Sequence, residues 1–299
     1  MTDGAGGSAG RAPAEPRPAG GAPVARRLAW LLALPLVLHL ALFLAYPTLH
    51  ALRLAFTDDV SGVAPSLATF RLLWRDGLFW RALAGNLVVP ALTVALEIVA
   101  GLALALLLAA RLPARRLLRT AVVLPFAIPE IVFLTVMRHV FAPRGYANAA
   151  LVAIGGTPAE WLLPGRPLAY LTVVAVDAWH TTPVVFLLLL AALAAIPEEI
   201  GDAATLDGAT GIRRFVAVTL PLLLPALGAA VLLRGLDALR LFATPLVLTG
   251  VEGVPVLSTY AYHQWSDYGN DGAAAAAACV LALVSVALTL PLLRRRVLA

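Results

Sequence analysis

The chain has 299 residues, of which 61% are hydrophobic and 13% are charged, and its mean hydropathy is +0.89. This composition differs from that of an average soluble domain and indicates a protein that crosses a membrane several times. The formal net charge of +5 rests on arginine, because the sequence contains no lysine, and a nucleotide-binding P-loop with its Gly-Lys-Ser/Thr is therefore excluded. The single cysteine, Cys279, excludes an intramolecular disulfide and a metal site built on several thiolates.

Residues 1–27 are rich in Gly, Ala, Pro and Arg, and we expect a disordered tail there. Residues 28–299 are predicted to form an all-α membrane domain, because they contain six apolar runs of the roughly 20 residues that a span needs. The predicted spans are Leu28–Leu49, Ala82–Ala110, Leu117–Phe141, Leu168–Ala195, Leu220–Phe242 and Ala273–Leu293. Prolines inside several spans favour kinked helices around a cavity, although proline is common in membrane helices for other reasons.

Arginines gather in alternate connections, and this bias predicts the orientation of the chain. The arginine-rich side carries Arg26, Arg27, Arg111, Arg115, Arg116, Arg119, Arg213, Arg214, Arg294, Arg295 and Arg296. On the other side, acidic residues offset the arginines of Thr57–Arg81, and Ala243–Gly272 has no arginine. We therefore expect both termini, and the connection between the fourth and fifth spans, to lie in the cytoplasm.

That connection, Ile196–Pro221, is the one long polar stretch that begins with acidic residues and continues with arginines. Acidic residues near its start suit the positive end of a short helix, and Gly208 can take the left-handed conformation that ends one. Ala203 and Ala204 have little bulk, so the helix could approach a partner closely. A solvated amphipathic connector without a partner would also show acids at its start and arginines at its end.

The full register resembles the cytoplasmic coupling loop of the membrane subunits of binding-protein-dependent ABC importers. The Glu-Ala-Ala of that family corresponds to Asp202-Ala203-Ala204, its glycine to Gly208 and its Leu-Pro to Leu220-Pro221. Asp202 is a departure, since aspartate keeps the charge of glutamate but shortens its reach. The resemblance implies contact with an ATPase through Glu198, Glu199, Asp202, Ala203, Ala204, Asp207, Gly208, Arg213, Arg214 and Pro221.

The resemblance also implies the six-helix transmembrane domain of a type I ABC importer, in the subfamily that carries sugars and polyols. Such a subunit lies in the cell's inner membrane among lipids and pairs with a second permease subunit, two cytoplasmic ATP-binding subunits and an extracytoplasmic solute-binding protein. It is not an enzyme, it binds no nucleic acid, and it needs no cofactor of its own because the partner subunits bind the ATP.

Ionisable side chains within the predicted spans are costly and usually face a cavity or each other. The candidates for a substrate pathway are Glu97, Glu130, Asp177, Arg234, Asp237 and Arg240. The i, i+3, i+6 spacing of the last three lets Asp237 pair with either arginine, in a polar route or in a self-neutralising structural cluster. Asp177 and His180 share a helix face, as a proton relay or as a packing pair. The histidines show no spacing that suits a metal.

Two functions fit these features. The first is the pore subunit of an ATP-driven importer. The alternative is a proton-coupled secondary transporter, which the intramembrane carboxylates Glu97, Glu130 and Asp177 would serve. Secondary transporters usually show inverted internal repeats, and none is evident in the sequence. An intramembrane enzyme is disfavoured because no nucleophile–base pair is apparent.

Overall fold

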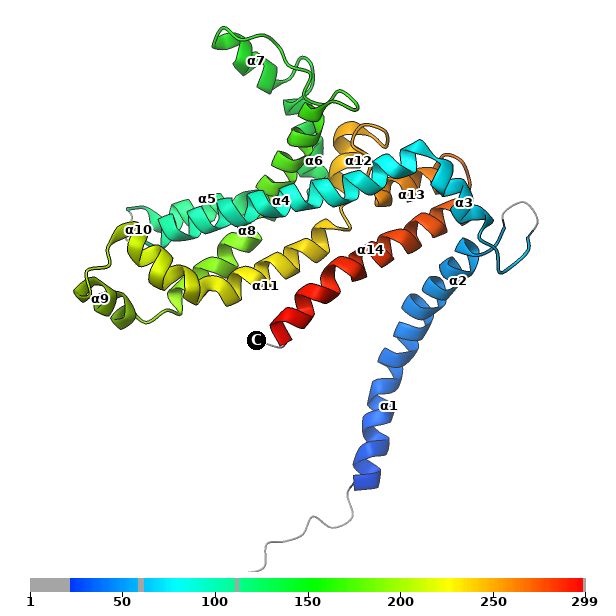
Figure 1. The fold of residues 1–299 in the computed structure, drawn as a ribbon, viewed down its shortest axis with the longest axis horizontal. Helices are drawn as coiled ribbons and strands as arrows, with labels where there is room; N and C mark the ends of the chain where they lie inside the picture. The colour runs from blue at the N-terminus through cyan, green and yellow to red at the C-terminus, as the bar shows by residue number, and fades with distance from the viewer. Residues whose placement is uncertain (1–21, 59–61, 111–112, 298–299) are drawn as a thin grey trace, which may run out of the picture. The chain divides into compact units, whose positions relative to one another are not determined.

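The computed structural model describes residues 22–58, 62–110 and 113–297, with side chains from Trp30 to Pro291 (Figure 1). The chain divides into two units, one ending at His50 and one beginning at Ala51. Five helices in the described part are long and apolar enough to cross a membrane, and each overlaps one predicted span. They are Trp30–Ala55, Gly77–Ala109, Pro167–Ala194, Gly211–Ala238 and Asp271–Pro291.

The first span is helical throughout, with one π-helical stretch. It consists of α1 (Ala22–Leu40), η1 (Ala41–Ala45) and α2 (Tyr46–Ala55). Its apolar side chains are exposed, as suits a helix surrounded by lipid or by another membrane subunit. Since α1 begins at Ala22, residues 22–27 of the predicted tail are helical, and residues 1–21 lie outside the described part of the chain.

The core forms where α4 (Gly77–Ala109) packs along α8 (Pro167–Ala194), with α11 (Leu220–Ala238) against both. The α14 helix (Asp271–Val297) packs on α11. Gly101 of α4 makes the close approach to α8 possible, because a Cβ at that position would lie 2.7 Å from Val185 Cγ1. Large apolar side chains then fill the interface at interior density, as at Leu108, Phe186 and Leu189.

The predicted third span, Leu117–Phe141, is not one straight helix. It is broken into α5 (Arg115–Ala127) and α6 (Glu130–Val140), which meet at 95°. Ile128 between them is extended, with φ −82° and ψ 133°, because the ring of Pro129 disfavours a helical residue before it. The described residues therefore hold six spans when this bent pair counts as one.

The fifth span also differs from its predicted bounds. It begins at Gly211 with α10 (Gly211–Arg214), continues through the π-helical η2 (Phe215–Thr219) into α11, and ends at Ala238. The second half of the predicted loop 196–221 is thus helical and continuous with the span. Pro221 has no backbone N–H to donate to the preceding turn. A π-helical turn is a common way for a helix to accommodate a missing donor.

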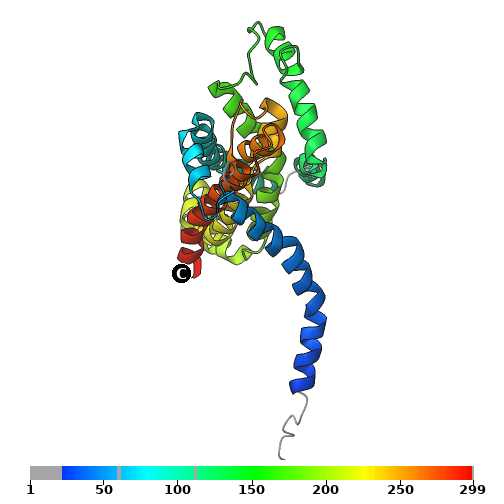
Figure 2. The ribbon, with the colours of Figure 1, turned by 90° about the vertical axis from the view of Figure 1, so that its right-hand side faces the viewer.

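Five short helices connect the spans in the described part of the chain: α3 (Ala68–Arg75), α7 (Tyr146–Ala153), α9 (Glu198–Leu206), α12 (Ala243–Thr249) and α13 (Leu257–Ser266). The α3, α12 and α13 helices lie at one end of the packed spans, and α9 lies with α10 at the opposite end (Figure 1). The α6 helix packs against α12 and α8, and the α7 helix that follows it projects from the packed helices (Figure 1 and Figure 2).

Two polar residues on or beside α4 hold the end that carries α13. The buried Asn86 amide donates to the Leu239 carbonyl at 3.1 Å and accepts from the Leu257 amide at 3.2 Å. The Tyr260 hydroxyl donates to Asp76 Oδ2 at 2.6 Å. Burial and the adjacent carboxylate raise the pKa of Tyr260, so this hydroxyl remains a donor at physiological pH. The two bonds of Asn86 satisfy backbone groups freed where α11 ends and α13 begins.

Candidate functional site

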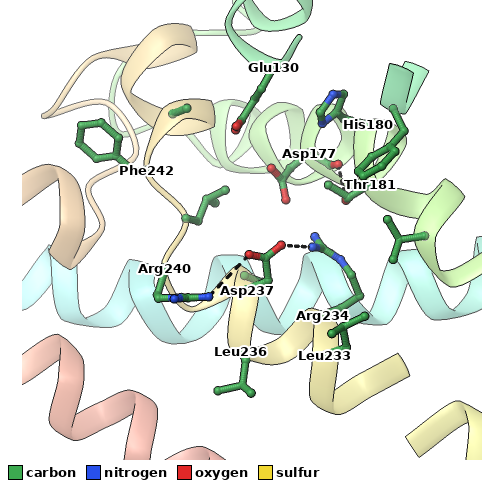
Figure 3. A pocket seen from close by; sticks show the side chains of 15 residues that line it. Glu130, Asp177, His180, Thr181, Leu233, Arg234, Leu236, Asp237, Arg240 and Phe242 are labelled. Atoms are coloured by element: carbon green, nitrogen blue, oxygen red, sulfur yellow. Dashed lines mark hydrogen bonds and ion pairs between the residues drawn. The ribbon is translucent and has the colours of Figure 1, made fainter. Parts of the chain in front are cut away.

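A cavity of about 690 Å³ lies among α5, α6, α8 and the end of α11 (Figure 3). Its apolar wall includes Phe126, Leu236 and Phe242. Its charged lining consists of Glu130, Asp177, Arg234, Asp237 and Arg240. Five of the six predicted pathway residues therefore line one space, although they come from three different spans. The sixth, Glu97, lies behind Arg234.

Glu97 and Arg234 form a buried ion pair that joins α4 to α11. Arg234 Nε lies 2.8 Å from Glu97 Oε2, and Arg234 Nη2 lies 2.9 Å from Glu97 Oε1. The Thr181 hydroxyl of α8 donates to Glu97 Oε1 at 2.5 Å. The carboxylate is fully buried, so this two-pronged pairing compensates the cost of removing both charges from water.

Asp237 pairs with Arg234 through its Oδ2 atom, as the spacing along the helix predicts. Arg240 is a weaker partner, because its Nη2 atom lies 3.9 Å from Asp237 Oδ1 and both side chains are largely exposed. Arg240 also stands beyond the last residue of α11. Arg234 is thus held between two carboxylates, one from its own helix and one from α4.

Asp177 and His180 of α8 line the same cavity, but no hydrogen bond or ion pair joins the two side chains among the described residues. Asp177 is 5% exposed and accepts a hydrogen bond at Oδ1 from the Thr244 hydroxyl at 2.7 Å. His180 stacks on Phe133 with ring centroids 4.7 Å apart, and its Nε2 atom lies 3.4 Å from the Ile128 carbonyl at the α5–α6 bend. The geometry places His180 at the bend rather than in a relay with Asp177.

Sequence reasoning did not find the threonines of this site. Thr181 and Thr244 are small, and nothing in their local sequence marks them as partners of carboxylates. Glu97 lies 137 positions from Arg234, so their pairing depends on how α4 packs against α11.

The second candidate region is the polar loop at the other end of the spans. Its α9 helix carries Glu198 and Glu199 in the first turn, as the sequence predicts. Gly208 has φ +78°, which confirms the predicted left-handed turn after the helix. The backbone amide of Ala209 then donates to the Ala204 carbonyl at 2.8 Å, which closes the end of α9.

Fewer residues of α9 are exposed than the sequence predicts. Ala204 and Gly201 are buried within the chain, whereas Ala203 and Asp202 are exposed. A Cβ on Gly201 would lie 2.0 Å from the guanidinium of Arg214. The Arg214 side chain of α10 therefore packs across α9 at Gly201. Of the two small residues predicted to approach a partner closely, Ala203 is exposed, whereas Ala204 already packs inside the loop.

Among the other predicted loop residues, Asp207 ends α9 and is exposed, as is Arg213 on α10. Pro221 lies within the first turn of α11. Leu206, which the sequence did not single out, is 89% exposed at the end of α9.

Spans around a polar cavity, with a protruding polar loop at one end, define a membrane transport protein. A family model described as "Binding-protein-dependent transport system inner membrane component" matches residues 97–297. The chain belongs to this family. It is accordingly a multi-pass inner-membrane protein and the permease subunit of an ATP-binding cassette importer, which sets aside the proton-coupled alternative.

Relatives along most of the chain agree with this family. The trehalose/maltose transport system permease protein MalF of Thermococcus litoralis is 34% identical over 269 residues, covering 86% of this chain and 90% of the relative. The trehalose transport system permease protein SugA of Mycobacterium tuberculosis is 36% identical over 232 residues, covering 75% of this chain and 74% of the relative.

The fold matches a solved structure of the same kind. A bacterial alginate ABC transporter, in complex with an alginate pentasaccharide-bound periplasmic protein, contains a chain that superposes with a TM-score of 0.78. The match covers 91% of this chain and 95% of that one at 22% sequence identity. At this identity the likeness shows the fold.

Proposed function

We propose that this permease carries a sugar or polyol and forms the pore together with a second permease subunit. Two cytoplasmic ATP-binding subunits and an extracytoplasmic solute-binding protein complete the importer. The names of the relatives, which concern trehalose, maltose and lactose, support the solute class. The hydroxyl and carboxylate groups around the cavity can exchange hydrogen bonds with a polyhydroxylated solute.

ATP hydrolysis belongs to the partner subunits. The chain has no lysine, so it has no P-loop of the Gly-Lys-Ser/Thr kind to hold the phosphates of ATP. We therefore expect no catalytic activity and no cofactor in the permease itself. Energy must then enter through a contact between subunits.

We place α9 in the cytoplasm. Arg115 and Arg119 both donate to the Leu108 carbonyl at the end of α4, at 2.9 and 3.1 Å. These arginines lie at the same end of the spans as α9 and α10 (Figure 1). Positive charge collects on the cytoplasmic side of membrane proteins, which also puts both termini of the chain there.

The observation that carries the coupling role is the exposed surface of α9. Asp202, Ala203 and Leu206 are exposed on a short helix that is closed by the left-handed turn at Gly208. A small residue flanked by an acid and a large apolar side chain forms a knob that a groove on the ATP-binding subunit can accept. Movement of that subunit would be transmitted through α9 and α10 to the fifth span, because α10 is continuous with it.

Replacing Ala203 with Trp tests this contact. The substitution should weaken binding of the ATP-binding subunit by about tenfold, since overpacking a close contact costs ~1–3 kcal/mol. The measurements are co-purification of the ATP-binding subunit and ATP-driven uptake of radiolabelled trehalose into proteoliposomes. Arg166→Gln, an exposed change away from α9, is the control and should behave as wild type.

Gly208 gives an independent check with its own matched control. Gly208→Val should uncouple hydrolysis from uptake, because a β-branched residue is strained at φ +78°. Gly208→Asn should retain most activity, because asparagine tolerates this conformation. Wild-type coupling in both Ala203→Trp and Gly208→Val would remove α9 from the energy path.

A further inference from the structure

We propose that Glu130 and Asp177 make the cavity selective for uncharged or cationic hydroxyl-rich solutes and exclude anionic ones. The inference rests on the proposed function, because it concerns the solute that the importer carries. It assigns the six predicted pathway residues to two groups, one that is neutralised within the protein and one that faces the solute.

The arginines of the cavity are already engaged. Arg234 is held by Glu97 on one side and by Asp237 on the other. Arg240 lies 3.9 Å from Asp237. Two guanidinium groups are therefore matched by two carboxylates in one connected cluster. A carboxylate or phosphate on a solute would have to displace Glu97 or Asp237 to bind Arg234.

The other two carboxylates face the cavity without a cation. Asp177 is 5% exposed, Thr244 donates to its Oδ1 atom, and its carboxylate points toward the cavity (Figure 3). Glu130, in the first turn of α6, points into the same space (Figure 3). Among the described residues neither acid has a salt bridge. The lining itself therefore has three carboxylates and two arginines, and with Glu97 behind Arg234 included the carboxylates outnumber the arginines by two.

The imidazole of His180 does not offset this surplus. His180 lines the cavity, but its ring stacks on Phe133 and its Nε2 atom is turned to the Ile128 carbonyl. The cavity therefore offers hydrogen-bond acceptors and a negative potential. Hydroxyl or ammonium groups can donate to the free carboxylate oxygens, whereas a uronate would meet like charge.

A thiol-modification experiment measures this potential without knowledge of the solute. Ala243→Cys, in the assembled complex with Cys279→Ser, places one thiol in the lining beside Thr244. The introduced thiol is modified with a cationic trimethylammonium methanethiosulfonate and, separately, with an anionic sulfonate methanethiosulfonate. Each modification rate is divided by the rate at which the same reagent modifies a small thiol in solution. We expect the cationic reagent to be favoured by about tenfold, as one or two unit charges nearby would give.

Neutralising the acids should abolish the preference. Glu130→Gln with Asp177→Asn should bring the ratio of the two rates close to one, and asparagine can still accept from Thr244. Glu130→Gln alone changes an exposed side chain and should lower the ratio part of the way. Glu160→Gln, an exposed acid outside the cavity, should leave it unchanged. A ratio near one in the parent protein, or a ratio that Glu130→Gln and the double variant do not alter, overturns the proposal.

Uptake separates this inference from the proposed function. Proteoliposomes with the complete importer are given trehalose, an amino-trehalose and a uronate analogue of trehalose. Dividing the uptake rate of each variant by that of wild type for the same solute removes the preference of the binding protein from the comparison. Glu130→Gln with Asp177→Asn should raise relative uptake of the uronate about tenfold over that of trehalose. If wild type takes up none of the three, import of this sugar class fails while the thiol ratio still decides the charge of the cavity.

Discussion

At the scale of single residues, the decisive contact is the ion pair between Glu97 and Arg234. A charged side chain inside a membrane protein is tolerated when its hydrogen-bonding groups are satisfied. Here the guanidinium has two carboxylate partners, and Thr181 donates to one of them. The cluster joins α4, α8 and α11 at one point, so it fixes the relative position of these three helices, of which α8 and α11 line the cavity.

Removing one partner should destabilise the protein strongly. We expect Glu97→Gln to lower the melting temperature of the purified importer by about 5–10 °C, because breaking a buried pair costs roughly 3–5 kcal/mol. Arg240→Gln is the matched control, since this exposed arginine makes a distant pair and should have almost no effect. The double change Glu97→Leu with Arg234→Met should recover much of the loss. Equal shifts for Glu97→Gln and Arg240→Gln would show that burial does not strengthen the pair.

Local spacing predicts part of this cluster. The pairing of Arg234 with Asp237 follows from their separation by three positions on one helix, and the structure confirms it. The bond to Glu97 could not be predicted, because helical periodicity does not tell which faces of two distant spans meet. Partners that share one element are readable from a sequence, whereas partners on different spans require the packing.

At the scale of elements, the bend between α5 and α6 shows what hydropathy cannot distinguish. The run from Leu117 to Phe141 is apolar and long enough to cross the membrane, and this property is the same for a straight helix and for a broken one. The Ile128–Pro129 step marks the break, but proline alone also fits a mild kink. The contacts of His180 and Phe133 with the bend come from packing against α8.

Spin labels can measure this bend. With cysteines at Leu117 and His139, which are both exposed, a straight helix would separate the two backbone positions by about 33 Å at 1.5 Å per residue. Two arms meeting at the observed 95° give roughly 21 Å from the same helical rise. We expect double electron–electron resonance on the assembled complex to report the shorter distance, after replacement of Cys279. The longer one would mean that α5 and α6 form a continuous span.

At the scale of the whole molecule, the two ends of the spans have different chemistry. One end carries α9, α10 and the arginines that bind the end of α4 (Figure 1). The other end carries α3, α12 and α13, where Asn86 and Tyr260 form hydrogen bonds between elements. The cavity lies within the spans that connect these ends. A contact made by α9 can therefore influence the cavity through the fifth span, which begins at α10 and carries Arg234 and Asp237.

The orientation of these ends can be measured with one cysteine at each. Tyr268, 67% exposed beyond α13, and Leu206, 89% exposed on α9, are suitable positions, whereas Ser258 is half-buried and bonded to the Leu241 carbonyl. In a Cys279→Ser background, a membrane-impermeant maleimide should label Tyr268→Cys in spheroplasts and Leu206→Cys in inverted vesicles. The reason is the positive charge beside α9, which retains that end in the cytoplasm. The opposite labelling would mean that the chain has the reverse orientation in the membrane. In that orientation α9 would lie on the side where no ATP-binding subunit can reach it.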